Sequence, residues 1–178
     1  MKYTDDQLIR RVEINAEGFE GWKAGVYDVW VRSTADAMDA FDDKVYTFEC
    51  KKDGTRPVFV MVGTGTTNAG SYGLKNFRDY NREGCAVLKS DVIVYGSHVY
   101  GTHKNYAAYR QAKPFPYFRD GDGDGKAEET GAQKSEIIFA NCHRASPNGV
   151  STRIYNWSVA CLVRNNINQW AGWLAFLK

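Results

Sequence analysis

The sequence predicts a mainly β domain, with a short helix near each end of the chain. Four observations support a single domain of this class. Short runs of aromatic and β-branched residues alternate with turns rich in Gly, Asp and Asn. Helical periodicity is confined to the two ends, and 178 residues suit one domain. A hydrophobic fraction of 43% and a charged fraction of 25% are ordinary for a globular protein. We therefore expect a single α+β domain over residues 1–178.

The two terminal helices have separate signals. Thr4 followed by Gln7 fits a capping box, and an apolar stripe follows, so we expect a helix over residues 4–12. Near the other end, Asn165 or Asn166 can cap a helix whose apolar residues recur at helical spacing. These residues are Ile167, Trp170, Ala171, Leu174 and Leu177.

Strands are predicted between these helices. Residues 27–32 form the first, and residues 44–62 form a hairpin around Asp53-Gly54, since Asp-Gly favours a tight turn. Residues 36–43 are acidic and irregular, with room for one helical turn. Further along we expect a Gly- and Thr-rich loop at 63–73, strands at 85–88 and 92–95, a helical turn at 104–111, a strand at 137–143 and a turn at 147–150.

Charge and segment composition exclude several classes of protein. Lys plus Arg number 23 and Asp plus Glu 21, so no basic field indicates a nucleic-acid partner. No run approaches the roughly 20 apolar residues of a membrane span. The first residues lack the apolar run of a secretory signal. We therefore expect synthesis in a host cytoplasm. The oligomeric state is left open.

Few residues are suited to catalysis or metal binding, because the chain has four Cys and three His. The cysteines form no CxxC pair, which disfavours a zinc ribbon. His143 ends one predicted strand, and Cys161 follows an extended segment over 151–157. A turn at Asn148-Gly149 would place these segments side by side and bring His143 near Cys161. A histidine base beside a thiol would form a nucleophilic dyad. The alternative is a buried core thiol and a strand-end histidine.

The same residues carry a family resemblance. His143 followed by Ser158-Val159-Ala160-Cys161 resembles the L,D-transpeptidase signature, a His and then Ser/Thr-His-Gly-Cys. Residues 62–72 resemble that family's V-S-T-G … T-P-x-G-x-Y segment. The run from Arg119-Asp120 through Cys142-His143-Arg144 to Trp157-Ser158 is similar to a variant in phage and prophage lysis proteins of gut bacteria. The resemblance covers about residues 44–165.

The resemblance implies a β-sandwich fold and an acyl-enzyme reaction on peptidoglycan stem peptides. Cys161 would be the nucleophile, His143 its base, and Ser158 with the preceding backbone would shape the oxyanion site. Further residues are expected to bind substrate: Tyr72, Arg144, Trp157, Ala160 and Arg164. A phage-encoded hydrolase acting at the cell wall after release, or within a virion, fits a chain without a signal. A transpeptidase proper and an injected wall-modifying toxin are the alternatives.

The chain also departs from the family pattern. Val159-Ala160 stands where the family has His-Gly, and Arg164 lies one position later than the family's Arg or Asn. These departures suggest a third alternative, a non-catalytic virion or cell-wall-binding domain.

Two further groups of residues are candidate sites. Asp120, Asp122 and Asp124 alternate with Gly as in the first half of a calcium loop, but Gly131 stands where a bidentate Glu is needed. A solvated acidic turn is favoured over a calcium site, and no cofactor is required. His98 and His103 lack the HExxH pattern of a zinc peptidase, which disfavours that class. The resemblance to the phage variant instead suggests that they line the substrate cleft.

Overall fold

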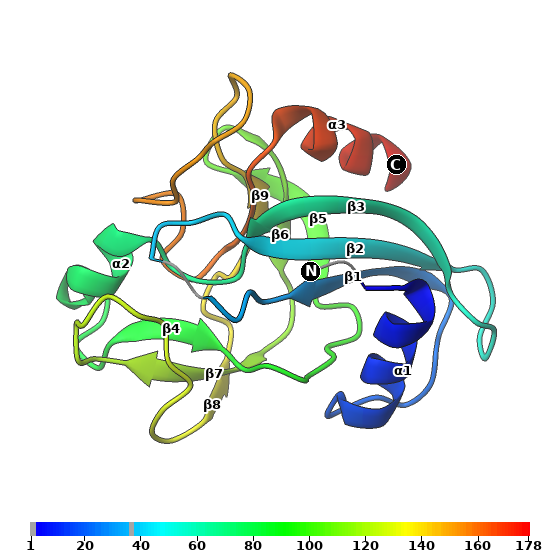
Figure 1. The fold of residues 1–178 in the computed structure, drawn as a ribbon, viewed down its shortest axis with the longest axis horizontal. Coiled ribbons are helices and arrows are strands. Elements are labelled where there is room, and N and C mark those ends of the chain that lie inside the picture. Colours follow the sequence, from blue (N-terminus) through cyan, green and yellow to red (C-terminus); the bar gives the residue numbers. More distant parts are fainter. Residues whose placement is uncertain (1–2, 36–37) are drawn as a thin grey trace.

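The computed structural model describes residues 3–35 and 38–178, and it is mainly β with two sheets (Figure 1). The larger sheet has the strand order β1-β2-β3-β10-β9-β6-β5, and the smaller has the order β4-β7-β8. The strands of the larger sheet are β1 (Gly25–Val31), β2 (Asp43–Cys50), β3 (Val58–Thr66), β5 (His98–His103), β6 (Tyr106–Gln111), β9 (Cys142–Arg144) and β10 (Leu162–Arg164). Those of the smaller are β4 (Cys85–Leu88), β7 (Phe115–Asp120) and β8 (Lys134–Glu136).

Both terminal helices are confirmed. Helix α1 (Asp5–Asn15) begins after Thr4, whose hydroxyl and backbone N–H form the expected capping box with Gln7. Helix α3 (Ile167–Phe176) is capped by the Asn166 side chain, which accepts from two backbone N–H groups. Helix α3 lies along the larger sheet (Figure 1), where Trp170 and Trp173 are buried. Leu162 and Cys142 belong to the same hydrophobic core as these tryptophans.

The N-terminal strands also match the sequence prediction. Strand β1 pairs with β2, and β2 forms an antiparallel hairpin with β3. The expected strand at 85–88 is confirmed as β4. The segment 63–73 was predicted as a loop, which is wrong at both of its ends. Strand β3 continues to Thr66 because its last residues pair with β10, and α2 (Ser71–Lys75) starts directly after Gly70. Part of the expected helical turn at 36–43 lies outside the described residues.

Three local predictions in the second half are wrong. Residues 104–111 were expected to turn helically, but β6 pairs with β5 as a hairpin. Residues 92–95 form no strand; Val92 makes only an isolated bridge to Glu17. The strand expected at 137–143 is restricted to β9, because the preceding backbone bonds to the Gln111 side chain instead of to a neighbouring strand.

The most consequential difference concerns the two strands beside the turn at 147–150. The turn was expected to place residues 137–143 beside residues 151–157, but residues 151–157 form no strand, and β9 instead pairs in parallel with β10. Parallel neighbours need a long crossover, and residues 145–161 supply it. Within this crossover, Ser151 bonds to Asn165, and Ile154 bonds to the Asp39 carbonyl. The crossover therefore leaves the sheet and returns to it immediately before Leu162.

Candidate active site

Cys161 is the residue before β10, at the end of the crossover. Its successor Leu162 donates a backbone hydrogen bond of 3.0 Å to the Asn141 carbonyl and pairs with Cys142 of β9. The Cys161 side chain is partly exposed, whereas Cys50, Cys85 and Cys142 are buried. The Sγ atom of Cys161 donates to the Phe139 carbonyl at 3.5 Å. Cys161 is therefore the most accessible of the four thiols.

His143 lies in β9, opposite Val163 of β10, and is only 1% exposed. Its Nδ1 atom is 2.7 Å from the Arg144 carbonyl oxygen and 3.0 Å from the Tyr106 hydroxyl. A carbonyl oxygen only accepts, so Nδ1 must carry the proton in the neutral ring. The other nitrogen, Nε2, is then an unprotonated acceptor. It is buried and has no hydrogen-bond partner among the residues that the structure describes.

The parallel pairing, and not a hairpin, places Cys161 near His143. Cys161 precedes Leu162, so it lies beside Asn141, two positions before His143 on the neighbouring strand. No hydrogen bond joins the two side chains, because Sγ donates to Phe139 and Nε2 has no described partner. Catalytic hydrogen bonds are often long in the absence of substrate. The arrangement thus contains a thiol and an unprotonated ring nitrogen on neighbouring segments.

Burial keeps both groups neutral. It raises the pKa of the Cys161 thiol to about 11, although the Asn141 backbone N–H and the charge of Lys104 act in the opposite direction. Burial also lowers the pKa of His143 to about 3, partly opposed by its hydrogen bond to the Arg144 backbone. At neutral pH the resting site holds a thiol and a neutral imidazole, not an ion pair.

The hairpin of β5 and β6 encloses His143. The ring of His103, the last residue of β5, stacks on the His143 ring with centroids 4.1 Å apart and an angle of 5°. Tyr106, the first residue of β6, bonds to Nδ1. His98, at the other end of β5, instead bonds to the Ala140 carbonyl at 2.9 Å. Tyr106 and Lys104 were not identified from the sequence, because the segment was read as helical and their placement depends on the hairpin.

The crossover loop before Cys161 is held by contacts within the protein. Ser158 is 1% exposed, and its hydroxyl donates to the Cys161 carbonyl at 2.8 Å, so it braces the loop. The Ser158 carbonyl accepts from Gly70, and the Val159 carbonyl accepts from the Cys85 thiol. In a trans peptide the N–H points away from the C=O. The N–H groups of Val159 and Ala160 therefore point away from these partners.

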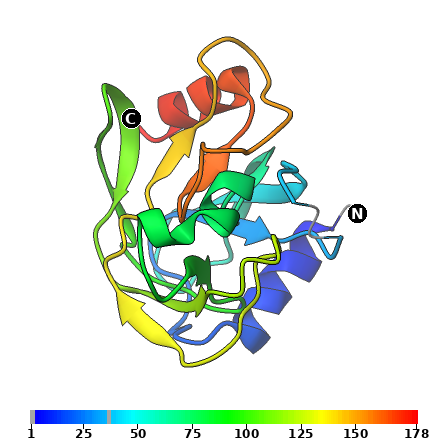
Figure 2. The same cartoon turned by 90° about the vertical axis from the view of Figure 1, so that its left-hand side faces the viewer.

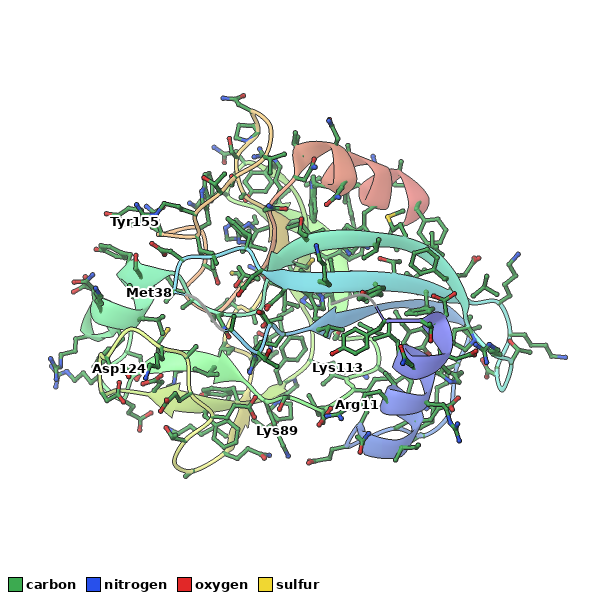
Figure 3. The ribbon with its side chains drawn as sticks, in the orientation of Figure 1. Arg11, Met38, Lys89, Lys113, Asp124 and Tyr155 are labelled. Carbon is green, nitrogen blue, oxygen red and sulfur yellow. The ribbon has the colours of Figure 1, made fainter. Side chains whose placement is uncertain are left out.

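The two segments that carry the family resemblance pack against each other. A Cβ atom at Gly70 would lie 2.1 Å from the Tyr155 carbonyl oxygen, so only glycine fits there. The Tyr72 N–H donates to the same carbonyl, and the Tyr72 ring contacts that of Tyr155. Figure 2 shows α2 close to the segment that leads into β10. Tyr155 lies at the same end of the molecule as α2 (Figure 3).

The remaining residues predicted to bind substrate differ in their burial and in their distance from His143. The Arg144 guanidinium lies over the Tyr106 ring at 4.1 Å, close to His143. Trp157 is partly exposed, and its backbone N–H donates to the Ile154 carbonyl within the loop. Ala160 packs against the core. Arg164 was expected at the substrate, but it is 1% exposed and pairs with Asp28 at 2.8 Å. Successive strand residues face opposite sides, which turns Arg164 toward α3.

The acidic loop uses its carboxylates for local hydrogen bonds. Asp120 accepts from the Glu128 N–H, Asp122 from the Asp124 N–H, and Asp124 from the Lys126 N–H. Asp124 lies on the surface of this loop (Figure 3). In the described part of the chain, no group of three or more His, Cys, Asp or Glu is arranged to hold a metal ion. Calcium binding by this loop remains a prediction.

Comparisons of the chain with protein-family models, with curated proteins and with solved structures give no match. Within residues 3–35 and 38–178, no helix has the length and apolar character needed to cross a membrane.

Proposed function

We propose that the chain is a cysteine hydrolase that cleaves peptide bonds in peptidoglycan stem peptides through an acyl-enzyme. In this proposal the fold is an L,D-transpeptidase-like β-sandwich, and the protein is a phage-encoded lysis enzyme that acts at the bacterial cell wall. The observation that carries the proposal is Nε2 of His143, which is buried without a partner among the described residues and lies on the strand beside the most accessible cysteine. Burying an acceptor without a partner is costly, and a catalytic role is one explanation for such an atom.

The proposed reaction begins from the neutral thiol. A bound substrate amide would draw the S–H of Cys161 away from the Phe139 carbonyl and toward Nε2 of His143. Sulfur attacks the carbonyl carbon as Nε2 accepts the proton, and the resulting oxyanion is stabilised by backbone N–H groups near Ala160. The imidazolium then protonates the leaving amine as the C–N bond breaks. Water, deprotonated by His143, releases the acid and restores the thiol.

Arg144 and Tyr106 support the base in this mechanism. The Arg144 carbonyl holds the proton on Nδ1, which leaves Nε2 free to act. The Tyr106 hydroxyl adds a second contact to the same nitrogen. The imidazolium formed during attack would remain hydrogen-bonded to this carbonyl.

Hydrolysis and transpeptidation share the acyl-enzyme and differ only in the acceptor, water or an amine. The same site therefore suits a transpeptidase proper or an injected wall-modifying toxin. An assay with a peptide amine acceptor distinguishes these activities by the mass of the product. If the cross-linked product exceeds the free acid, the proposed activity would be transpeptidation and not hydrolysis.

A non-catalytic wall-binding or virion domain is the second candidate, and one observation favours it. The pKa of Cys161 is raised to about 11, and its S–H bonds to a backbone carbonyl instead of to a base. A thiol in this state is a weak nucleophile until something changes its surroundings.

Purified protein incubated with muropeptides, with products followed by mass spectrometry, separates the two candidates. Cys161→Ala and His143→Ala should each abolish product, while Cys50→Ser, a change at a thiol of a different core cluster, should not. Equal product from wild type and Cys161→Ala, or none from wild type, would refute the enzyme. In the second case, retention on insoluble peptidoglycan would support the binding domain.

A further inference from the structure

The segment that precedes β9 presents apolar side chains beside the candidate nucleophile. Ile138 packs against the core, whereas its neighbours Ile137 and Phe139 are 48% and 67% exposed. The Phe139 carbonyl oxygen accepts from Sγ of Cys161 at 3.5 Å. A large apolar side chain thus stands in solvent on the residue whose backbone touches the thiol.

The buried side chain of Gln111 fixes the conformation of this segment. Its Oε1 accepts from the N–H groups of Ile138 and Ala140, at 3.0 and 2.9 Å. Its Nε2 donates to the carbonyls of Lys113 and Glu136. The bonds to Ile138 and Ala140 hold the backbone on both sides of Phe139, and Phe139 lies between the two held residues. On the same segment, the Ala140 carbonyl bonds to Nε2 of His98.

Phe139 adopts a backbone conformation that its side chain disfavours. Its φ is +60°, a region in which glycine and asparagine are common and bulky residues are rare. The Asn141 N–H bonds to the Phe139 carbonyl at 2.7 Å and closes a tight turn around Ala140. Strained backbone that is held by surrounding bonds is concentrated at functional sites. An aromatic residue at this position therefore has an unfavourable backbone conformation and an exposed apolar side chain.

We propose that Phe139 forms an apolar subsite beside Cys161, which binds an aliphatic side chain of the peptide next to the scissile bond. The inference rests on the proposed function for the identity of its occupant. A group bound at the thiol is adjacent to the Phe139 backbone, and the exposed ring belongs to that same residue. Such a contact removes apolar surface from water on both partners. Phe139 is in this way a specificity-determining residue and not a catalytic one.

The subsite can be tested without turnover, by the reactivity of Cys161 toward two maleimides. N-cyclohexylmaleimide and N-(2-hydroxyethyl)maleimide add the same ring to the thiol and differ only in an apolar or polar substituent. The rate ratio at Cys161, measured by peptide mapping and divided by the ratio for glutathione, should be roughly ten in the wild type. In Phe139→Asn, which keeps a residue suited to positive φ but removes the ring, it should fall by roughly tenfold.

Two control variants accompany this measurement. Phe139→Leu keeps an apolar side chain and should retain most of the preference. Ile14→Asn removes another exposed apolar side chain, on α1, and should change nothing. An equal ratio in wild type and Phe139→Asn, with equal thermal unfolding midpoints, would overturn the subsite.

The muropeptide assay distinguishes failure of the subsite from failure of the proposed function. If the wild type is active, Phe139→Asn should raise KM by roughly tenfold with a smaller effect on kcat. An unchanged KM would overturn the assignment to the peptide side chain. An inactive wild type with an intact maleimide preference would refute the hydrolase and leave an apolar subsite at the thiol.

Discussion

His143 and Arg164 are buried to the same degree on neighbouring strands, but His143 is neutral and Arg164 is charged. Each is 1% exposed. The Arg164 guanidinium pairs with Asp28 at 2.8 Å and lies over the rings of Trp30 and Trp173. His143 has one nitrogen bound to two oxygen atoms and another, Nε2, without a described partner. Nε and Nη1 of Arg164 are likewise buried without a described hydrogen-bond partner. The contrast is therefore one of charge, between a buried cation with a counter-charge and a buried base that is kept neutral.

This difference indicates that Arg164 serves stability, whereas His143 keeps an acceptor that a reaction can use. An arginine cannot lose its proton in a protein, so its burial requires a counter-charge such as Asp28. A histidine can be buried neutral, and burial then lowers its pKa, as in His143. Neutral burial retains an acceptor that a substrate or a thiol can use.

Replacing Arg164 should cost the most stability. Arg164→Met leaves the partly buried Asp28 without its ion-pair partner, so the free energy of unfolding should fall by about 3–5 kcal/mol. Denaturant unfolding monitored by tryptophan fluorescence gives the value. The double variant Arg164→Met/Asp28→Asn also removes the unpaired charge of Asp28 and should recover part of the lost unfolding free energy. A loss below about 1 kcal/mol would contradict the structural role assigned to the pair.

The ease of predicting these two residues from sequence also differed. The terminal helices, the β1 strand and the hairpin of β2 and β3 follow local signals, such as the Thr4 capping box and the Asp53-Gly54 turn. The sequence predicts that His143 and Cys161 meet through a hairpin, whereas in the structure parallel pairing of β9 and β10 places them on adjacent segments. Parallel pairing depends on contacts of the crossover with Asp39 and Asn165, which no local pattern encodes.

The rest of the site depends on the same long-range contacts. Arg164 was placed at the substrate because its position follows Cys161, and its partner Asp28 is 136 residues away in sequence. Tyr106 and Lys104 lie near His143 only because residues 98–111 form a hairpin. The alternation of polar and apolar residues there is weak, so the strand signal was missed.

Lowering the pH should destabilise the protein through His143. Its pKa is about 3 in the folded state and near 6.5 when unfolded, so the unfolded chain binds more protons between these values. Stability from this group is therefore present above pH 6.5 and is lost as the pH falls. The expected loss is roughly 2 kcal/mol between pH 6.5 and 4.5. Unfolding curves of wild type and His143→Gln should converge toward acid, and parallel curves would contradict the neutral burial of His143.

Raising the pH should activate the thiol with no contribution from histidine ionisation. The pKa of Cys161 is about 11, so its rate of alkylation by iodoacetamide should rise about tenfold per pH unit from 7 to 10. Mass spectrometry of the Cys161 peptide gives the rate, and the buried Cys85 and Cys142, each with a pKa raised to about 12, should react more slowly. An inflection near pH 6 would indicate an ion pair with His143 and refute the neutral resting state.

The smallest expected effect concerns the second partner of the base. Tyr106→Phe removes the hydroxyl at 3.0 Å from Nδ1, while the Arg144 carbonyl at 2.7 Å remains. The hydroxyl also donates to the Arg144 carbonyl at 3.3 Å, and loss of these contacts should cost about 0.5–1.5 kcal/mol of unfolding free energy. Nitrogen-15 shifts of the His143 ring should still report a proton on Nδ1, because the carbonyl alone suffices to hold it there. A proton that moves to Nε2 in this variant would show that Tyr106 selects the tautomer, and the basic nitrogen near Cys161 would then depend on the β5–β6 hairpin instead of on β9 itself.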